Sequence, residues 1–260
     1  MAFTLIGYSA SQDTSGVLTT TAALADPHVR VSGNDVSIPS DLSNVAGVYA
    51  IGATMTRAAL VSPSIRRRYP VEVFPIDAAA TPTDPWHFHD VAQQVISLDV
   101  DESLNFQFAE SGAGAQRGSG LVWLSDGPIT PDSNGEFFTI RATGTTTLAT
   151  YAWTNCTLTF NDTLPAGTYE IVGMHAISAG AIAARLVIPQ YPWRPGVICS
   201  TGVNVFSGTQ FRYGNYGVFG SFTHMTPPTV DFLSSSADTS QTVYLDLRMV
   251  SGRLSGVGRM

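Results

Sequence analysis

Lysine is absent from this 260-residue sequence, and all 13 basic side chains are arginine. Arginine forms rigid bidentate pairs and is favoured over lysine at protein interfaces, although a compositional bias of the genome would have the same effect. Only 13% of the residues are charged, against about 25% in a typical soluble domain. We therefore expect a surface that neighbouring subunits cover, or one that is rich in neutral polar side chains.

The formal net charge of −7 argues against a general nucleic-acid-binding protein, because that function needs a basic surface. Cys156 and Cys199 are the only cysteines. They are too few for a disulfide framework and lack the spacing of a metal site, so we expect two buried thiols.

Neither a signal peptide nor a membrane span is recognisable. The first six residues have no basic segment ahead of their apolar side chains, which a secretory signal would need. No apolar run approaches the ~20 residues of a membrane-spanning helix. We expect synthesis in the cytoplasm without a membrane anchor of the protein's own.

The sequence repeats itself at a shift of 126 residues. Residues 38–63 align without a gap on residues 164–189, with nine identities in 26 positions, where roughly two would occur by chance. The same shift places residues 104–106 on 230–232, and a slightly larger one places 3–5 on 138–140. We interpret the repeat as a tandem duplication, with one half at residues 1–130 and the other at 131–260.

Strand patterns dominate both halves. Apolar and polar residues alternate in ISLDV (96–100), LNFQF (104–108), CTLTF (156–160) and VYLDL (243–247), with turn clusters between such runs. The alanine-rich residues 176–186 could form a short helix, but Gly173 and Gly180 favour two buried strands with a kink. Each half suits an eight-stranded jelly roll, so the expected fold is all-β, with two tandem jelly-roll β-sandwiches.

This duplicated layout resembles the double jelly-roll major capsid proteins of tailless icosahedral bacteriophages. The likeness covers nearly the whole chain and is centred on AGAIAARLVIPQYPWRPGVI (179–198) and its counterpart ATMTRAALVSPSIRRRYPVEV (53–73). No short diagnostic motif marks that family. Many of its members carry long loops that form towers, for which this chain has little room, so a low and smooth capsomer is expected.

The resemblance implies a structural subunit of the virus shell and not an enzyme. Such a subunit forms a homotrimer whose six sandwiches make a pseudo-hexameric block that tiles an icosahedral facet. The implied partners are neighbouring capsomers and penton or minor capsid proteins, with an internal membrane or the genome beneath the shell. No cofactor, metal or specific nucleic-acid recognition is expected, and the protein would be located in the virion after assembly in the host cytoplasm.

Arginines and aromatic side chains are the candidate interface residues. The basic run Arg66-Arg67-Arg68 would bridge neighbouring subunits or face the genome or anionic lipid. Aromatic residues next to arginine also anchor protein interfaces, and the sequence offers Trp193 with Arg194 and Arg212 with Tyr213. Exposed aromatic rings stack on sugars as well, so a carbohydrate-binding or adhesion β-sandwich, as in a viral spike or a lectin, is the alternative function.

A metal-dependent enzyme of the cupin type is a third hypothesis. His87 and His89 resemble the HxH start of the cupin metal motif. The glutamate that should follow is missing, because positions 92–94 hold Ala, Gln and Gln. The hypothesis needs His175 or His224 to converge on this pair. The acidic residues Asp99, Asp101 and Glu102 could hold Ca²⁺ through their oxygen atoms, but a solvated hairpin end explains them more simply.

Overall fold

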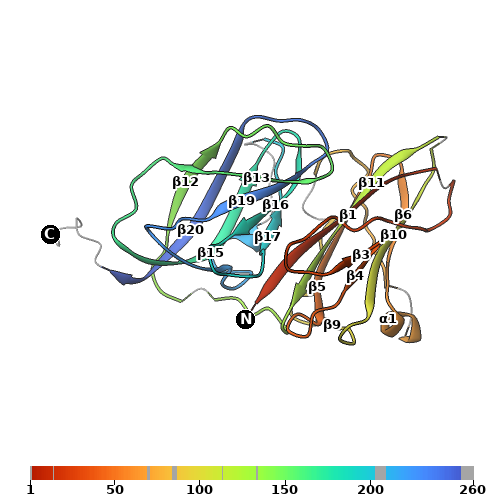
Figure 1. The fold of residues 1–260 in the computed structure, drawn as a ribbon, viewed down its shortest axis with the longest axis horizontal. Helices are drawn as coiled ribbons and strands as arrows, with labels where there is room; N and C mark the ends of the chain where they lie inside the picture. Colours follow the sequence, from red (N-terminus) through yellow and green to blue (C-terminus); the bar gives the residue numbers. More distant parts are fainter. Residues whose placement is uncertain are drawn as a thin grey trace.

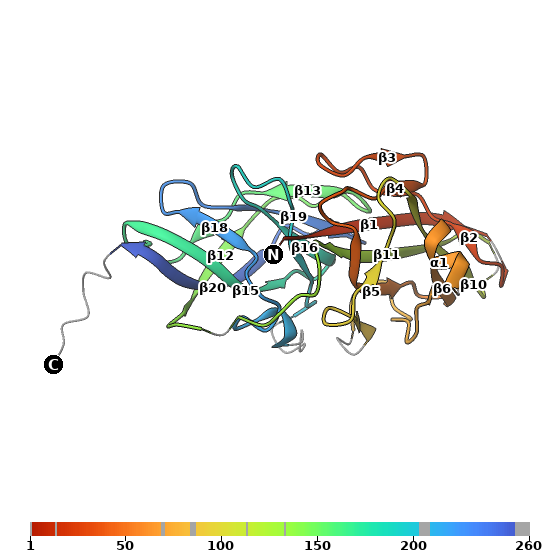
Figure 2. The same cartoon turned by 90° about the horizontal axis from the view of Figure 1, so that it is seen from below.

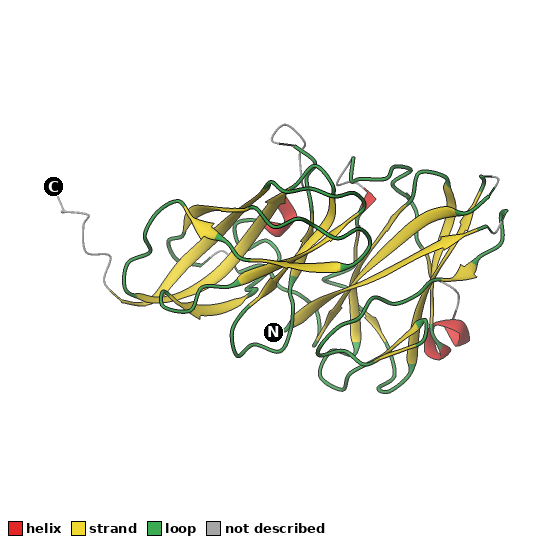
Figure 3. Cartoon of the chain, turned by 45° about the horizontal axis from the view of Figure 1, so that its top comes forward, coloured by secondary structure: helices red, strands yellow, loops and turns green. Residues whose placement is uncertain are grey.

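The computed structural model describes residues 2–13, 15–68, 71–83, 87–112, 114–132, 134–202 and 209–252. Almost all of the regular structure is strand (Figure 3), and its helical elements include the short helix α1 (Pro63–Arg68) and the 3₁₀ turn η2 (Thr209–Phe211). The chain forms two bodies that lie side by side (Figure 1). The expected all-β fold of two tandem jelly rolls is confirmed.

The first jelly roll contains two antiparallel sheets. One has the order β1-β11-β5-β8, with β9 also on β5: β1 (Phe3–Gln12), β11 (Gln116–Ser125), β5 (Asn44–Ile51), β8 (His89–Asp90) and β9 (Ile96–Ser97). The other has the order β3-β4-β10-β6-β7, with β2 also on β10: β3 (Val31–Ser32), β4 (Asp35–Ser37), β10 (Ser103–Glu110), β6 (Met55–Val61), β7 (Val71–Glu72) and β2 (Thr19–Thr20).

The second jelly roll also contains two sheets. The first has the order β14-β12-β20-β15-β18: β14 (Thr159–Phe160), β12 (Phe138–Gly144), β20 (Gln241–Gly252), β15 (Gly167–Ile177) and β18 (Gly220–Thr223). The second has the order β13-β19-β16-β17: β13 (Trp153–Cys156), β19 (Thr229–Ser234), β16 (Ala181–Val187) and β17 (Gly196–Ile198).

The strand order of the second half repeats that of the first. The series β1-β11-β5-β8 corresponds to β12-β20-β15-β18, and β10-β6-β7 corresponds to β19-β16-β17. Strands β6 and β16 begin and end 126 residues apart, and β10 and β19 begin 126 residues apart. The repeat in the sequence therefore reflects a repeated strand topology.

Two local expectations can be compared with the strands of the structure. Residues 156–160, which alternate like one strand, are divided between β13 and β14, which belong to different sheets. Residues 176–186 contain the end of β15 and the start of β16, so the two expected buried strands are present and the alternative of a helix is not; the two strands lie in opposite sheets. In both places the chain crosses from one sheet of the sandwich to the other.

The sheet that contains β1, β11 and β5 is covered on both faces. On β11, Val122 and Leu124 face the core of the first jelly roll, whereas Leu121 and Trp123 belong to the core that continues into the second. Side chains on a strand alternate between faces, so a strand covered on both sides is buried at successive positions. This explains the unbroken buried run at the start of β1 and shows that the two jelly rolls share a large apolar contact.

Candidate functional site

The contact between the two jelly rolls contains a cluster of aromatic rings. Phe88 from the first half lies against Trp123 at 4.7 Å and against Phe211 of the second half at 5.2 Å between ring centroids. Phe3 contacts Tyr216 and Phe219 edge to face at 5.5 and 5.0 Å. Such ring pairs stabilise by about 0.5–1.5 kcal/mol beyond the area that they bury. The cluster therefore holds the two halves in one relative orientation.

The backbone of Gly196 and of Gly47 lies close to the rings of Trp123 and Phe88 in this cluster. The Trp123 Nε1–H donates to the carbonyl oxygen of Gly196 in the other half, at 2.8 Å. A Cβ atom on Gly47 would lie only 2.5 Å from the Phe88 ring. Glycine at position 47 thus gives the ring room to lie against β5.

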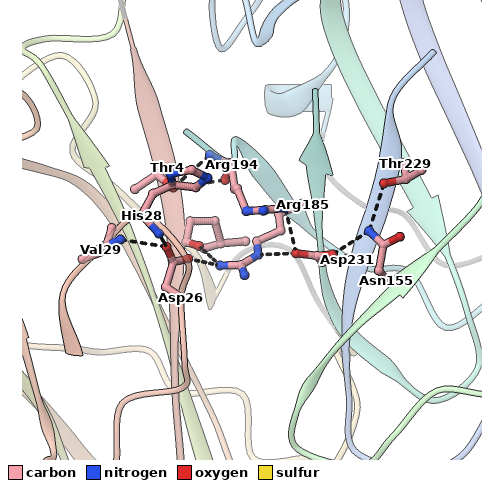
Figure 4. Close-up of polar contacts among 10 residues, drawn as sticks. Thr4, Asp26, His28, Val29, Asn155, Arg185, Arg194, Thr229 and Asp231 are labelled. Carbon is pink, nitrogen blue, oxygen red and sulfur yellow. Dashed lines mark hydrogen bonds and ion pairs between the residues drawn. The ribbon is translucent and has the colours of Figure 1, made fainter. Parts of the chain in front are cut away.

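Arg185 on β16 forms the centre of a buried ionic network between the halves (Figure 4). Its side chain is almost fully buried and donates through Nη1 to the Asp26 carboxylate at 2.5 Å and to the Leu5 carbonyl at 3.2 Å. Through Nε it donates to Asp231 on β19 at 3.2 Å. The guanidinium also lies over the Trp153 ring, 4.0 Å from its centroid. Arg185 therefore joins the second jelly roll to two segments of the first.

Arg194 completes the network. Its Nη1 donates to the same Asp231 oxygen at 3.2 Å, and its backbone N–H donates to Thr4 Oγ1 at 3.1 Å. The Leu5 N–H donates in turn to the Arg194 carbonyl at 2.8 Å. Two arginines thus face two aspartates, so the charges balance. Burial lowers the pKa of Arg185, and the carboxylates of Asp26 and Asp231 oppose that effect.

Arg212 and Tyr213 lie on the outer face of the second jelly roll. The fully buried Asp246 accepts from Arg212 Nε at 2.6 Å, from the Tyr213 N–H at 3.0 Å and from Thr139 Oγ1 at 2.6 Å. The Arg212 guanidinium also covers the Tyr213 ring at 4.6 Å. These hydrogen bonds to Asp246 fix the segment after η2 to the sheet.

The half-buried His175 lies near Arg212 and Asp246. Burial, reinforced by the charge of Arg212, lowers the pKa of His175 to about 4.

The predicted interface residues fall into three groups. Arg194 and Arg212 are paired within the chain, and Trp193 is partly buried against the core of the first jelly roll. Tyr213 is exposed and lies 5.5 Å from the exposed ring of Phe137. Arg66, Arg67 and Arg68 form the end of α1, and their side chains lie outside the described part. Contacts of these seven residues with other copies stay a prediction.

Sequence reasoning did not find Arg185, Asp26 or Asp231. One signal was available, because Arg185 is the single charged residue in the buried strand AIAARLV, where the repeat places alanine at position 59. A charged side chain in a buried strand needs a partner. The identity of that partner does not follow from the sequence, since Asp26 is 159 positions away.

The metal hypotheses gain no support from the geometry. Across the described ranges, no three His, Cys, Asp or Glu side chains lie together as a metal site would require. The Asp90 carboxylate accepts a hydrogen bond from the Ala92 N–H, and burial lowers the pKa of His89.

Among the acidic residues Asp99, Asp101 and Glu102, the Glu102 carboxylate accepts hydrogen bonds from the Ser64 N–H at the start of α1 and from the Asp99 N–H. Glu102 thereby ties α1 to the turn before β10.

Both cysteines are buried free thiols, as predicted, and burial raises the pKa of Cys199. Among the described helices, none has the length and apolar character that would let it cross a membrane.

Comparison with known proteins shows a likeness to a solved structure. The sequence matches no family model, and no curated protein matches it. Among solved structures, the chain is similar to the major capsid protein P2 from bacteriophage PM2, at 10% sequence identity and a TM-score of 0.27. The alignment covers 96% of this chain and 98% of that chain.

Proposed function

We propose that this protein is the major capsid protein of an icosahedral virus, such as a tailless bacteriophage, with a structural role and no enzymatic one. The observation that carries the proposal is a pair of jelly rolls with the same strand order, joined through a common core. We assign the first jelly roll to residues 1–130 and the second to residues 131–260.

Rigidity between the halves supports this role. A closed symmetric assembly repeats the same contacts in every copy, so its subunit must keep one shape. The aromatic cluster around Phe88 and the Arg185 network both oppose rotation of one jelly roll against the other. Three such blocks around a threefold axis would present six jelly rolls, which gives the pseudo-hexagonal outline that tiles a facet.

The edges of the sheets fit a controlled assembly. Three of the outer strands, β7, β8 and β14, are two residues long, and short edge strands limit unspecific pairing with other sheets. The small share of charged residues lowers the cost of burying the sides of the molecule against neighbours. Association would therefore occur through defined surfaces.

The proposal locates the protein in the virion after assembly in the host cytoplasm. Its partners would be two further copies in a trimer, neighbouring capsomers, and penton or minor capsid proteins. Arg66, Arg67, Arg68 and the exposed Tyr213 are candidates for these contacts. The arginine run is also the candidate for contact with the genome or an internal membrane.

Sedimentation and electron microscopy of the purified protein test the proposal. We expect a trimer of about 83 kDa, three times the 27.6 kDa chain, and closed shells or hexagonal plates at higher concentration. A protein that stays monomeric at every concentration and binds glycans on an array would contradict the capsid role. That result would favour the carbohydrate-binding alternative.

A further inference from the structure

Strand β20 has an open edge at its C-terminal end. Its pairing with β15 continues to Gly252, but its pairing with β12 ends where Phe138 faces Leu247. Within the described part of the chain, no strand pairs with residues 248–252 on the β12 side. This end of β20 lies at the end of the molecule that is remote from the first jelly roll (Figures 1 and 2). A neighbouring chain could therefore reach it.

The open edge borders a groove between β20 and the residues before β12. Its lining includes Gly135, Phe137, Met249 and Val250. Val250 and Phe137 have exposed fractions of 57% and 42%, and the exposed ring of Tyr213 lies beside Phe137. An unpaired strand edge next to exposed apolar side chains is the arrangement that binds an extended peptide as an added strand.

Acidic side chains outnumber basic ones around the groove. Arg248 donates to Asp132 at 2.9 Å and to Glu170 at 2.7 Å. Its positive charge is therefore compensated by two carboxylates of the same chain. Glu136 lines the groove and is exposed. These four side chains together carry an excess of negative charge, which favours a basic occupant.

The chain itself contains a segment with matching chemistry. Residues 253–260, RLSGVGRM, follow β20 directly and contain two arginines, three apolar side chains and no acidic residue. We propose that residues 253–260 of a second copy bind in this groove as an added strand on the open edge of β20. This inference rests on the proposed function, because it requires that copies of the chain associate. It specifies one contact between two copies.

The test compares full-length variants by sedimentation over a range of concentrations. Val250→Lys adds a positive charge in the groove, and a double variant, Leu254→Asp with Val257→Asp, makes the segment acidic. We expect each to raise the concentration at half-association at least tenfold. The matched control is Val17→Lys, at an exposed valine of the first jelly roll, which should associate like the unchanged protein.

Hydrogen exchange supplies an independent measurement. In the unchanged protein, amides of residues 248–252 should become protected as copies associate, and a synthetic peptide of residues 253–260 should compete where a scrambled peptide does not. If the segment instead folds back on its own β20, protection will not depend on concentration, and the inference is wrong. If all variants associate as the unchanged protein does, the groove is not the contact between copies, whereas the capsid role stands. A protein that does not associate at any concentration contradicts the capsid role.

Discussion

Arg185 shows how one buried charge can connect the two halves of this molecule. Its guanidinium is enclosed by two carboxylates, a backbone carbonyl and the face of Trp153, so its charge is compensated where water is excluded. Loss of one member of a buried ionic network leaves the others unpaired, which costs about 3–5 kcal/mol. The importance of Arg185 therefore lies in the groups that it satisfies.

Replacement of Arg185 by methionine should lower the free energy of unfolding by about 3–5 kcal/mol, because Asp26 and Asp231 would be left buried without this partner. Urea denaturation followed by tryptophan fluorescence measures the change. The exposed ion pair of Arg57 and Glu72 provides the control, since Arg57→Met should cost less than about 1 kcal/mol. Equal effects of the two substitutions would refute a structural role for the network.

At the scale of elements, long connections cover the sheets and fix the contact between them. The segment after η2 lies on the outer face of β15 and β20, where Asp246 holds Arg212 and the Tyr213 N–H. Together, η2 and this segment also bring Phe211 and Tyr216 into the aromatic cluster. One connection thus stabilises both its own sheet and the contact with the first jelly roll.

Gly173 on β15 is the position at which this packing can be tested. An added Cβ atom would lie 2.4 Å from Asp246 Oδ2 and 2.8 Å from the Tyr213 nitrogen. Gly173→Ala should therefore displace the segment and lower stability by about 1–3 kcal/mol. Thermal unfolding measures the loss, and the Tyr213 amide should exchange faster. Gly127→Ala, which meets no atom within 4 Å, should have little effect on either measurement.

At the scale of the whole molecule, the two jelly rolls form one block with a continuous core. The sheet of β1, β11 and β5 contributes one face to each core, so neither half can lose its packing without exposing the other. Because each half packs against the other through this core, we expect the two halves to unfold together. We regard this coupling as the physical basis of the proposed capsid role.

The stability of the block should fall as the pH decreases from about 6.5 to 4. In the folded state the pKa of His175 is lowered to about 4, so between these values the unfolded chain binds more protons, and acid favours unfolding. Below pH 4, pairing with Arg248 holds the pKa of Asp132 at about 2, and its contribution disappears as the pH falls towards that value.

Unfolding in urea at several pH values measures this dependence. His175→Gln should flatten the part between pH 6.5 and 4, whereas replacement of the exposed His28 by glutamine is the matched control. An unchanged slope in the His175 variant would show that another group causes the acid sensitivity.

The sequence by itself determined the fold class and the internal repeat. Alternation of apolar and polar residues is a property of neighbouring positions, and the shift of 126 residues is visible without any contact. In the structure, the alternating residues form β-strands, and the repeat corresponds to a repeated strand order. The ends of strands were less predictable, as at residues 156–160, because crossing between sheets depends on how the sandwich closes.

Only the tertiary structure decided which residues join the halves. The pairs of Arg185 with Asp26 and of Trp123 with Gly196 link positions that are 159 and 73 residues apart, and no local pattern specifies such partners. The same holds for Arg194 and Arg212, which sequence reasoning placed at interfaces and the fold pairs with Asp231 and Asp246. Local chemistry selects the strand, whereas the packing of distant strands selects the partner of each buried charge.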